Sequence, residues 1–265
     1  MKYLKKYKLF ESVNEQEIHD LCKKYSIIFY TINSDGSIDV DGDVNLDNKG
    51  LTKLPVKFRR VSGDFYCSIN NLTSLEGAPS SLGGTFYCHN NNLTSLVGAP
   101  SQVGNFYCYN NNLTNLEGAP TSVGGNFWCS DNNLTSLKGA PNGVGGSFDC
   151  RYNKLTSLEE APRSVSGDFI CNHNQITSLE GLEWKSFNRI DLRNNPVFEI
   201  IKDWINNKDR IDLIEYFIDM NVIQDTKTDK PKLILPRLEA FHEEMDIKMD
   251  IDLEEVIKNY EIINT

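Results

Sequence analysis

Apolar residues recur with a fixed period between Val44 and Val197. The period is marked by phenylalanines at Phe65, Phe86, Phe106, Phe127, Phe148 and Phe169. Successive steps are 21, 20, 21, 21 and 21 residues, and one further step in each direction reaches Val44 and Ile190. Eight copies of one short unit are typical of a solenoid, in which each unit packs on its neighbours.

Each copy repeats three further positions after the phenylalanine. The second position holds Cys67, Cys88, Cys108, Cys129, Cys150 and Cys171, with Leu46 and Leu192 in the outer copies. The fifth position holds Asn70, Asn91, Asn111, Asn132, Asn153, Asn174 and Asn195. The seventh position holds Leu51, Leu72, Leu93, Leu113, Leu134, Leu155, Ile176 and Val197. Residues two apart share a face of a strand, so phenylalanine and cysteine are predicted to point inward from strands of about three to five residues.

The remainder of each copy contains Gly-Ala-Pro, which rules out a regular helix. We therefore expect extended or polyproline-like backbone on that side of the coil. The asparagines are predicted to form a ladder that satisfies backbone groups left open by the turn.

The frame L-x-L-x-x-N-x-L, with Phe and Cys in the first two leucine positions, resembles the leucine-rich-repeat family. The segment LTSLEGAPxxV is similar to the short repeats of bacterial effectors, and the flanks YTINSDGSIDVDGDVNL and LPRLEAFHEEM resemble leucine-rich proteins of large tailed phages. The resemblance implies an α+β solenoid with a parallel sheet on its concave face, and a protein-binding role. A phage origin would make the partner a host protein and the location the host cytoplasm.

The chain divides into three predicted parts. Residues 1–43 form an N-terminal cap, with a helix that begins at Ser12 or Asn14 and ends near Tyr25, then a β-hairpin. Residues 44–197 are the solenoid. Residues 198–265 form an acidic C-terminal cap, whose helices are predicted at 197–207, 209–223, 235–245 and 252–263.

Composition narrows the functional classes. The net charge is −10, and a protein that binds the nucleic-acid backbone would carry a basic stripe instead. The lysine-rich start has no apolar segment of a secretory signal, and no run of about twenty apolar residues occurs, so a cytoplasmic location is expected.

Six of the seven cysteines fill the inward slot and no CxxC occurs, so we expect packing rather than disulfides or metal. Alternating acids between Asp39 and Asp47 lack the glutamate of an EF-hand, and no cofactor is expected.

The candidate site is a column of outward residues on the predicted strands. It holds Asn45, Tyr66, Tyr87, Tyr107, Trp128, Asp149, Ile170 and Asp191, and two positions further along their strands lie His89, Tyr109 and Arg151. Protein interfaces concentrate exposed Tyr, Trp and Arg, so we predict partner binding by Tyr66, Tyr87, His89, Tyr107, Tyr109, Trp128 and Arg151.

Other interpretations remain open. The aromatic residues could simply stabilise the sheet, or could bind a carbohydrate or nucleotide by stacking. The acidic C-terminal helices could instead be the contact surface, as a mimic of nucleic acid. No phosphate-binding loop, dinucleotide fingerprint or catalytic triad is found in the sequence, so an enzyme is not expected.

Overall fold

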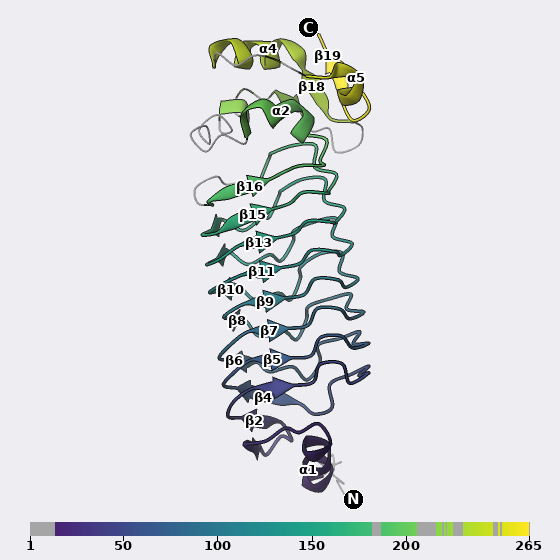
Figure 1. The fold of residues 1–265 in the computed structure, drawn as a ribbon, viewed down its shortest axis with the longest axis vertical. Helices are drawn as coiled ribbons and strands as arrows, with labels where there is room; N and C mark the ends of the chain where they lie inside the picture. The colour runs from purple at the N-terminus through teal and green to yellow at the C-terminus, as the bar shows by residue number, and fades with distance from the viewer. Residues whose placement is uncertain are drawn as a thin grey trace, which may run out of the picture.

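The computed structural model describes residues 14–181, 187–205, 216–218, 220, 222–224, 230–245, 249 and 251–264, with backbone alone for 203–205. It is a long stack of coils with a helix-containing unit at each end (Figure 1). Helix α1 (Glu15–Lys24) begins after Asn14, whose side chain accepts the Glu17 N–H at 3.2 Å. The predicted hairpin follows as β1 (Tyr30–Ile32) and β2 (Ile38–Val40), paired antiparallel.

The predicted solenoid is confirmed as one parallel sheet of eight strands in chain order. Its strands are β3 (Val44–Asn45), β5 (Phe65–Tyr66), β7 (Phe86–Tyr87), β9 (Phe106–Tyr107), β11 (Phe127–Trp128), β13 (Phe148–Asp149), β15 (Asp168–Ile170) and β16 (Arg189–Asp191). Each phenylalanine is in register with the next, as in the pairing of Phe86 with Phe106. Most of the strands have two residues, fewer than expected, and a left-handed turn residue such as Asn90 follows four positions after each phenylalanine.

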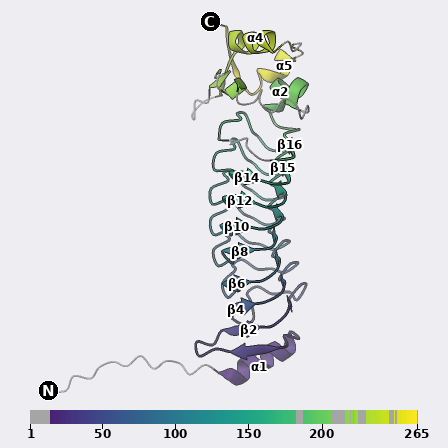
Figure 2. The ribbon, with the colours of Figure 1, turned by 90° about the vertical axis from the view of Figure 1, so that its left-hand side faces the viewer.

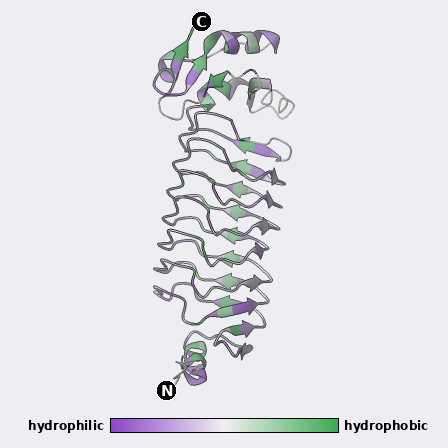
Figure 3. Cartoon of the chain, turned by 180° about the vertical axis from the view of Figure 1, so that it is seen from behind, coloured by the Kyte–Doolittle hydropathy of each residue, from purple (hydrophilic) through white to green (hydrophobic). Residues whose placement is uncertain are grey.

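The inward positions build a continuous core. Rings of Phe65, Phe86, Phe106, Phe127, Phe148 and Phe169 follow one another at 5.3–5.4 Å between centroids. The six cysteines of the repeat lie beside them with no exposed surface. Burial in this apolar layer raises the pKa of each of these thiols, because a thiolate would lose its hydration there. The thiols are therefore packing groups, as predicted. Figure 3 shows hydrophobic residues on the strands of successive coils.

The predicted asparagine ladder is present and ties each coil to the previous one. The Asn111 Oδ1 accepts the Leu93 N–H at 2.9 Å, and its Nδ2 donates to the carbonyls of Cys88 and Cys108, both at 3.1 Å. The same pattern recurs from Asn70 to Asn195. These bonds satisfy buried backbone groups at the turn, where they would otherwise be unpaired.

The opposite side of the coil is extended, as expected, but it also forms strands that the sequence did not predict. They are β4 (Phe58–Val61), β6 (Ser81–Leu82), β8 (Gln102–Val103), β10 (Ser122–Val123), β12 (Gly143–Val144) and β14 (Ser164–Val165). Strand β2 pairs with β4 and β4 with β6, while β8, β10, β12 and β14 form another parallel sheet (Figure 2). With extended backbone on both sides, successive coils keep a similar spacing on each side. The stack in Figures 1 and 2 accordingly bends little.

The C-terminal unit is partly helical. Helices α2 (Phe198–Ile205) and α4 (Leu235–Glu244) match two predicted helices, whereas most of the helix predicted at 209–223 lies outside the described residues. The helix predicted at 252–263 is wrong in its second half: α5 (Leu253–Val256) is short and β19 (Glu261–Ile263) is a strand. Strand β19 pairs with β18 (Lys232–Ile234), and β18 also pairs with β17 (Ile223–Gln224). The β-branched residues in these strands favour a sheet.

Candidate functional site

Outward residues of four neighbouring strands bring four aromatic side chains into one row. Tyr66 is in register with Tyr87, Tyr87 with Tyr107, and Tyr107 with Trp128. The centroids of these successive ring pairs are 4.5, 5.2 and 4.7 Å apart. The parallel register of the sheet therefore produces the row, since the sequence repeats an aromatic residue at one outward position.

A second, shorter row lies two residues further along the strands. The His89 and Tyr109 rings stack with centroids 4.4 Å apart. His89 meets Tyr87 edge-on at 6.3 Å, and Tyr109 lies 6.4 Å from Trp128. Both rows thus form one surface, which we call the aromatic stripe. The stripe comprises Tyr66, Tyr87, His89, Tyr107, Tyr109 and Trp128.

The state of His89 follows from its surroundings. Its Nδ1 lies 3.0 Å from the Ser68 hydroxyl, on the neighbouring strand. Burial lowers the pKa of His89, because the imidazolium would lose hydration, and the charge of Asp47 offsets this in part. The stripe therefore presents a neutral imidazole near pH 7.

The seventh predicted residue, Arg151, lies apart from the aromatic stripe. The small, buried Ser130 occupies the intervening position between Tyr109 and Arg151. The Arg151 Nε lies 3.2 Å from a carboxylate oxygen of Asp149, the residue that follows Trp128 in the first row. Arg151 therefore marks the edge of the aromatic stripe toward β16 rather than its centre.

Three aspartates at the β3–β5 end of the stripe were not predicted as site residues. The Asp43 carboxylate accepts the Asp64 N–H at 2.7 Å, and the Asp64 carboxylate accepts the Thr85 N–H at 2.7 Å. The Asp47 carboxylate accepts the Ser68 N–H at 2.6 Å. The first two belong to a polar ladder at the strand starts, which continues through Asn105, Asn126 and Ser147. Its sequence signal is a short polar residue before nearly every phenylalanine. Burial and the hydrogen bond to Asp64 raise the pKa of Tyr66 to about 12.

The opposite end of the face carries ion pairs. Beyond Arg151, Arg189 pairs with Asp168 at 3.3 Å and Arg193 with Asp191 at 2.6 Å. Three arginines and three aspartates leave this end without net charge, whereas the β3–β5 end has three carboxylates. The open face is thus electrostatically asymmetric along the axis of the stack.

A column of strained residues borders the face at the turn. Asn48, Ile69, Asn90, Asn110, Asp131, Tyr152, His173 and Asn194 all have φ between 52° and 57°. Asn and Asp tolerate this left-handed conformation, but a β-branched residue such as Ile69 rarely does. Ile69 is also 51% exposed, so this conformation presents an apolar side chain beside the acidic end of the stripe.

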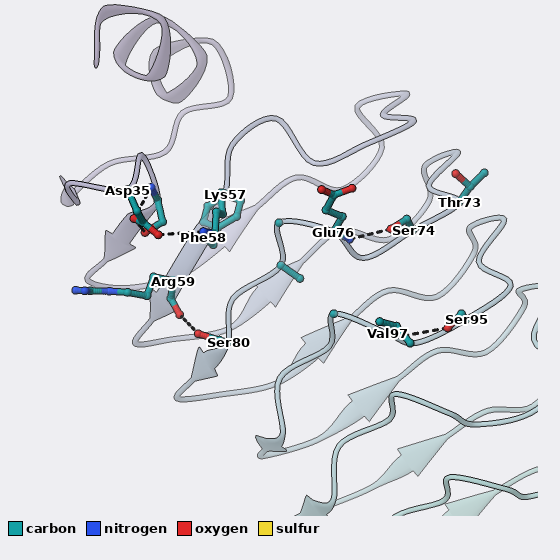
Figure 4. Close-up of a pocket in the computed structure, with 14 residues that line it drawn as sticks. Asp35, Lys57, Phe58, Arg59, Thr73, Ser74, Glu76, Ser80, Ser95 and Val97 are labelled. Carbon is teal, nitrogen blue, oxygen red and sulfur yellow. Dashed lines mark hydrogen bonds and ion pairs between the residues drawn. The ribbon is translucent and has the colours of Figure 1, made fainter. Parts of the chain in front are cut away.

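A separate hollow of about 690 Å³ lies on the outer side of the N-terminal coils (Figure 4). Phe58, Ala78 and Val97 supply its apolar lining, and Lys57 pairs with Asp35 at its rim at 3.0 Å. The Ser80 hydroxyl donates to the Arg59 carbonyl at 2.9 Å across two coils. None of the predicted site residues lines this hollow.

Within the described ranges, no cluster of three or more His, Cys, Asp or Glu residues has the arrangement of a metal site. The same ranges contain no helix with the length and apolar character needed to cross a bilayer.

The parallel sheet, the leucine columns and the asparagine ladder define a leucine-rich-repeat solenoid with a cap at each end. No protein-family model and no curated protein matches the chain. Among solved structures, it is similar to YopM from Yersinia enterocolitica WA-314, with 25% sequence identity and a TM-score of 0.41. That match covers 58% of this chain and 38% of YopM, so this chain spans well under two thirds of that protein.

Proposed function

We propose that the chain is a non-enzymatic protein-binding module whose contact surface is the aromatic stripe, with Arg151 at its edge. The observation that carries the proposal is the meeting of six aromatic side chains on one open sheet face. Tyr and Trp give large, rigid contact area with a polar group at the tip, which is why they dominate binding energy at interfaces. If the phage resemblance of the flanks holds, the partner is a host protein.

The ring geometry favours a protein partner over a stacked ligand. A base or sugar inserted between two rings would need them roughly 7 Å apart, twice a van der Waals contact. The neighbouring rings of the longer row are 4.5–5.2 Å apart and already cover one another. The row therefore leaves no room for a ligand between its rings, whereas side chains of a folded partner can pack over the row as a whole.

The first prediction concerns the triple variant Tyr87→Ala, Tyr107→Ala, Trp128→Ala. We expect it to lose the partner by about 100-fold in affinity or more, since truncation of each interface aromatic typically costs 1–2 kcal/mol or more. The matched control is Thr94→Ala, Thr114→Ala, Thr135→Ala, which removes exposed residues of the same coils outside the stripe. Capture from a host lysate with both variants, followed by mass spectrometry and titration, measures the difference.

Unfolding of the triple variant is checked by circular dichroism, and the single variant Trp128→Ala provides a milder test because Trp128 is 37% exposed. Undiminished capture by a folded triple variant would refute the stripe and direct attention to the acidic C-terminal unit. A thermal shift with oligosaccharides or short oligonucleotides would instead support the stacking alternative.

A further inference from the structure

The β3–β5 end of the aromatic stripe combines an aromatic ring with a group of carboxylates. Asp43 and Asp47 lie two residues before and two after Asn45, so all three point to the open face. Among the described residues, no lysine, arginine or histidine lies within ion-pair distance of Asp43, Asp47 or Asp64. Each carboxylate accepts a backbone N–H through one oxygen, and the second Asp64 oxygen accepts the Tyr66 hydroxyl. Because a carboxylate offers about four lone-pair sites, acceptor capacity remains for a partner.

Tyr66 is the outermost ring of the stripe. One face of its ring stacks on Tyr87, with an interplanar angle of 6°. The residue on its other side is Asn45, whose Oδ1 accepts the Asp47 N–H at 3.1 Å and so lies along its own strand. The Tyr66 hydroxyl donates to Asp64 at 3.0 Å. The ring therefore forms a wall with the Asp64 carboxylate at its hydroxyl end.

We propose, building on the proposed function, that the partner presents an extended segment with an arginine at this end, followed by apolar side chains over Tyr87, Tyr107 and Trp128. A planar guanidinium stacks on an aromatic face and donates in pairs to carboxylates, which matches both features of this site. Strands β3 to β11 span four intervals, about 19 Å at 4.8 Å each, which about six extended residues cover.

The surrounding charges fix the direction of the segment. At the other end, Arg151, Arg189 and Arg193 are paired with aspartates. This end therefore attracts neither cations nor anions strongly. Beyond Asn45, Lys24 and Lys49 line a hollow of about 520 Å³ and repel a cation there. The arginine therefore lies on the Tyr66 side of Asn45.

The test selects a random 12-residue peptide display library on the full chain. We expect enriched peptides with an arginine three to six residues from an aromatic or aliphatic residue. The matched variant Asp43→Asn, Asp47→Asn, Asp64→Asn keeps the oxygens that accept backbone N–H groups and removes only charge. On this variant the arginine preference should disappear while the apolar preference remains.

An enriched peptide is then titrated by fluorescence anisotropy beside a copy with citrulline in place of arginine. Wild type should prefer the arginine peptide by about twofold to fivefold, as for a partly exposed charge pair, and the Asn variant should not discriminate. Equal discrimination by both proteins, or absence of arginine from the enriched peptides, would overturn this inference. Binding that survives in the Tyr87→Ala, Tyr107→Ala, Trp128→Ala variant would instead refute the stripe as the contact surface.

Discussion

At the scale of single residues, the fold depends on side chains that take the place of backbone hydrogen-bond partners. Each buried asparagine of the ladder accepts at least one N–H and donates to two or more carbonyls where the chain leaves its strand. Neighbouring asparagines of the same NNN runs do none of this, since they face solvent. Residues with identical chemistry and adjacent positions therefore differ widely in their contribution to stability.

The second prediction compares Asn111→Ala with Asn112→Ala. Loss of the Asn111 amide leaves the buried Leu93 N–H without its partner and removes one of two asparagine donors from each of the Cys88 and Cys108 carbonyls. We therefore expect the free energy of unfolding to fall by about 2 kcal/mol. Asn112 is exposed, so its replacement should change that free energy by less than about 0.5 kcal/mol. Urea denaturation followed by circular dichroism measures both. Equal losses would contradict the ladder.

The third prediction concerns Asp149 and Asp191, which occupy equivalent positions with opposite pKa shifts. Burial raises the pKa of Asp149, although the Arg151 amide and charge partly oppose this. Hydrogen bonds from the Arg193 side chain lower the pKa of Asp191 against the effect of burial. A raised carboxyl pKa means that stability falls as pH rises through it, whereas a lowered one means that stability is lost as pH falls through it.

Asp149→Asn should therefore be more stable than wild type at pH 7, and its advantage should shrink as pH falls through the raised pKa and be lost by pH about 4, where the unfolded carboxyl is also protonated. Asp191→Asn should be less stable at pH 7, and its deficit should shrink as pH falls from about 4 through the lowered pKa. Denaturation midpoints across pH 3–7 test both signs. A deficit for Asp149→Asn at pH 7 would show that the Arg151 pair outweighs burial.

At the scale of the element, the turn between Leu and Pro requires a left-handed residue. Gly77, Gly98, Gly118, Gly139 and Gly181 have φ between 85° and 100° there. Glu160 occupies the same position in its coil with φ 62°, which costs an L-residue about 1–2 kcal/mol. A Cβ on Gly139 would lie 2.6 Å from the Leu116 backbone, so neighbouring coils also pack tightly at this turn.

The fourth prediction follows from the difference between Glu160 and the glycines at the same turn position. Glu160→Gly should raise the free energy of unfolding by roughly 0.5–1 kcal/mol, because the relief of backbone strain exceeds the added freedom of the unfolded chain. The reciprocal variant Gly139→Glu should lower it by about 1–3 kcal/mol. Denaturant titration of the two variants measures the contrast, and a destabilising Glu160→Gly would mean that the Glu160 side chain makes a compensating contact.

Elements that follow from the alternation of buried and exposed positions along a strand could be predicted from the sequence. Alternation around Phe106 and Cys108 specifies which face of the strand is buried, and repetition every 21 residues then specifies the parallel register. The second row of strands could not be predicted, because Gln102–Val103 is too short to show alternation and pairs only through stacking. Strand β19 was missed because local helical spacing competed with pairing to the distant β18.

One part of the candidate site could likewise be predicted from the sequence, and another part could not. The row of Tyr66, Tyr87, Tyr107 and Trp128 follows from register, so it could be predicted. The small Ser130 between Tyr109 and Arg151 can also be read from one column of the repeat. The ion pair of Arg151 with Asp149 and the acidic end depend on contacts between side chains, so neither could be predicted in that way.

At the scale of the whole molecule, a stack of coils must be closed where the next coil is missing. Along the outer turns, the Thr114 carbonyl accepts the Thr135 N–H at 3.0 Å, and the Thr156 carbonyl accepts the Thr177 N–H at 3.1 Å. In the coil that follows β15, the Thr177 carbonyl instead accepts the hydroxyl of Tyr260 at 2.6 Å. Tyr260 is 2% exposed and lies 83 residues away in sequence. One side chain of the C-terminal unit thus takes the place of a following repeat.

The fifth prediction is that Tyr260→Phe loosens the C-terminal unit without changing the central coils. The ring remains to fill its buried site, but the Thr177 carbonyl loses its partner, which costs about 1–2 kcal/mol. In a solenoid each coil depends mainly on its neighbours, so the loss should stay local. Hydrogen exchange should accelerate for amides of α2 and of the β16 coil and stay unchanged near β7–β9, with exposed Lys258→Ala as the control. Uniform acceleration along the chain would show that the stack unfolds as one cooperative unit.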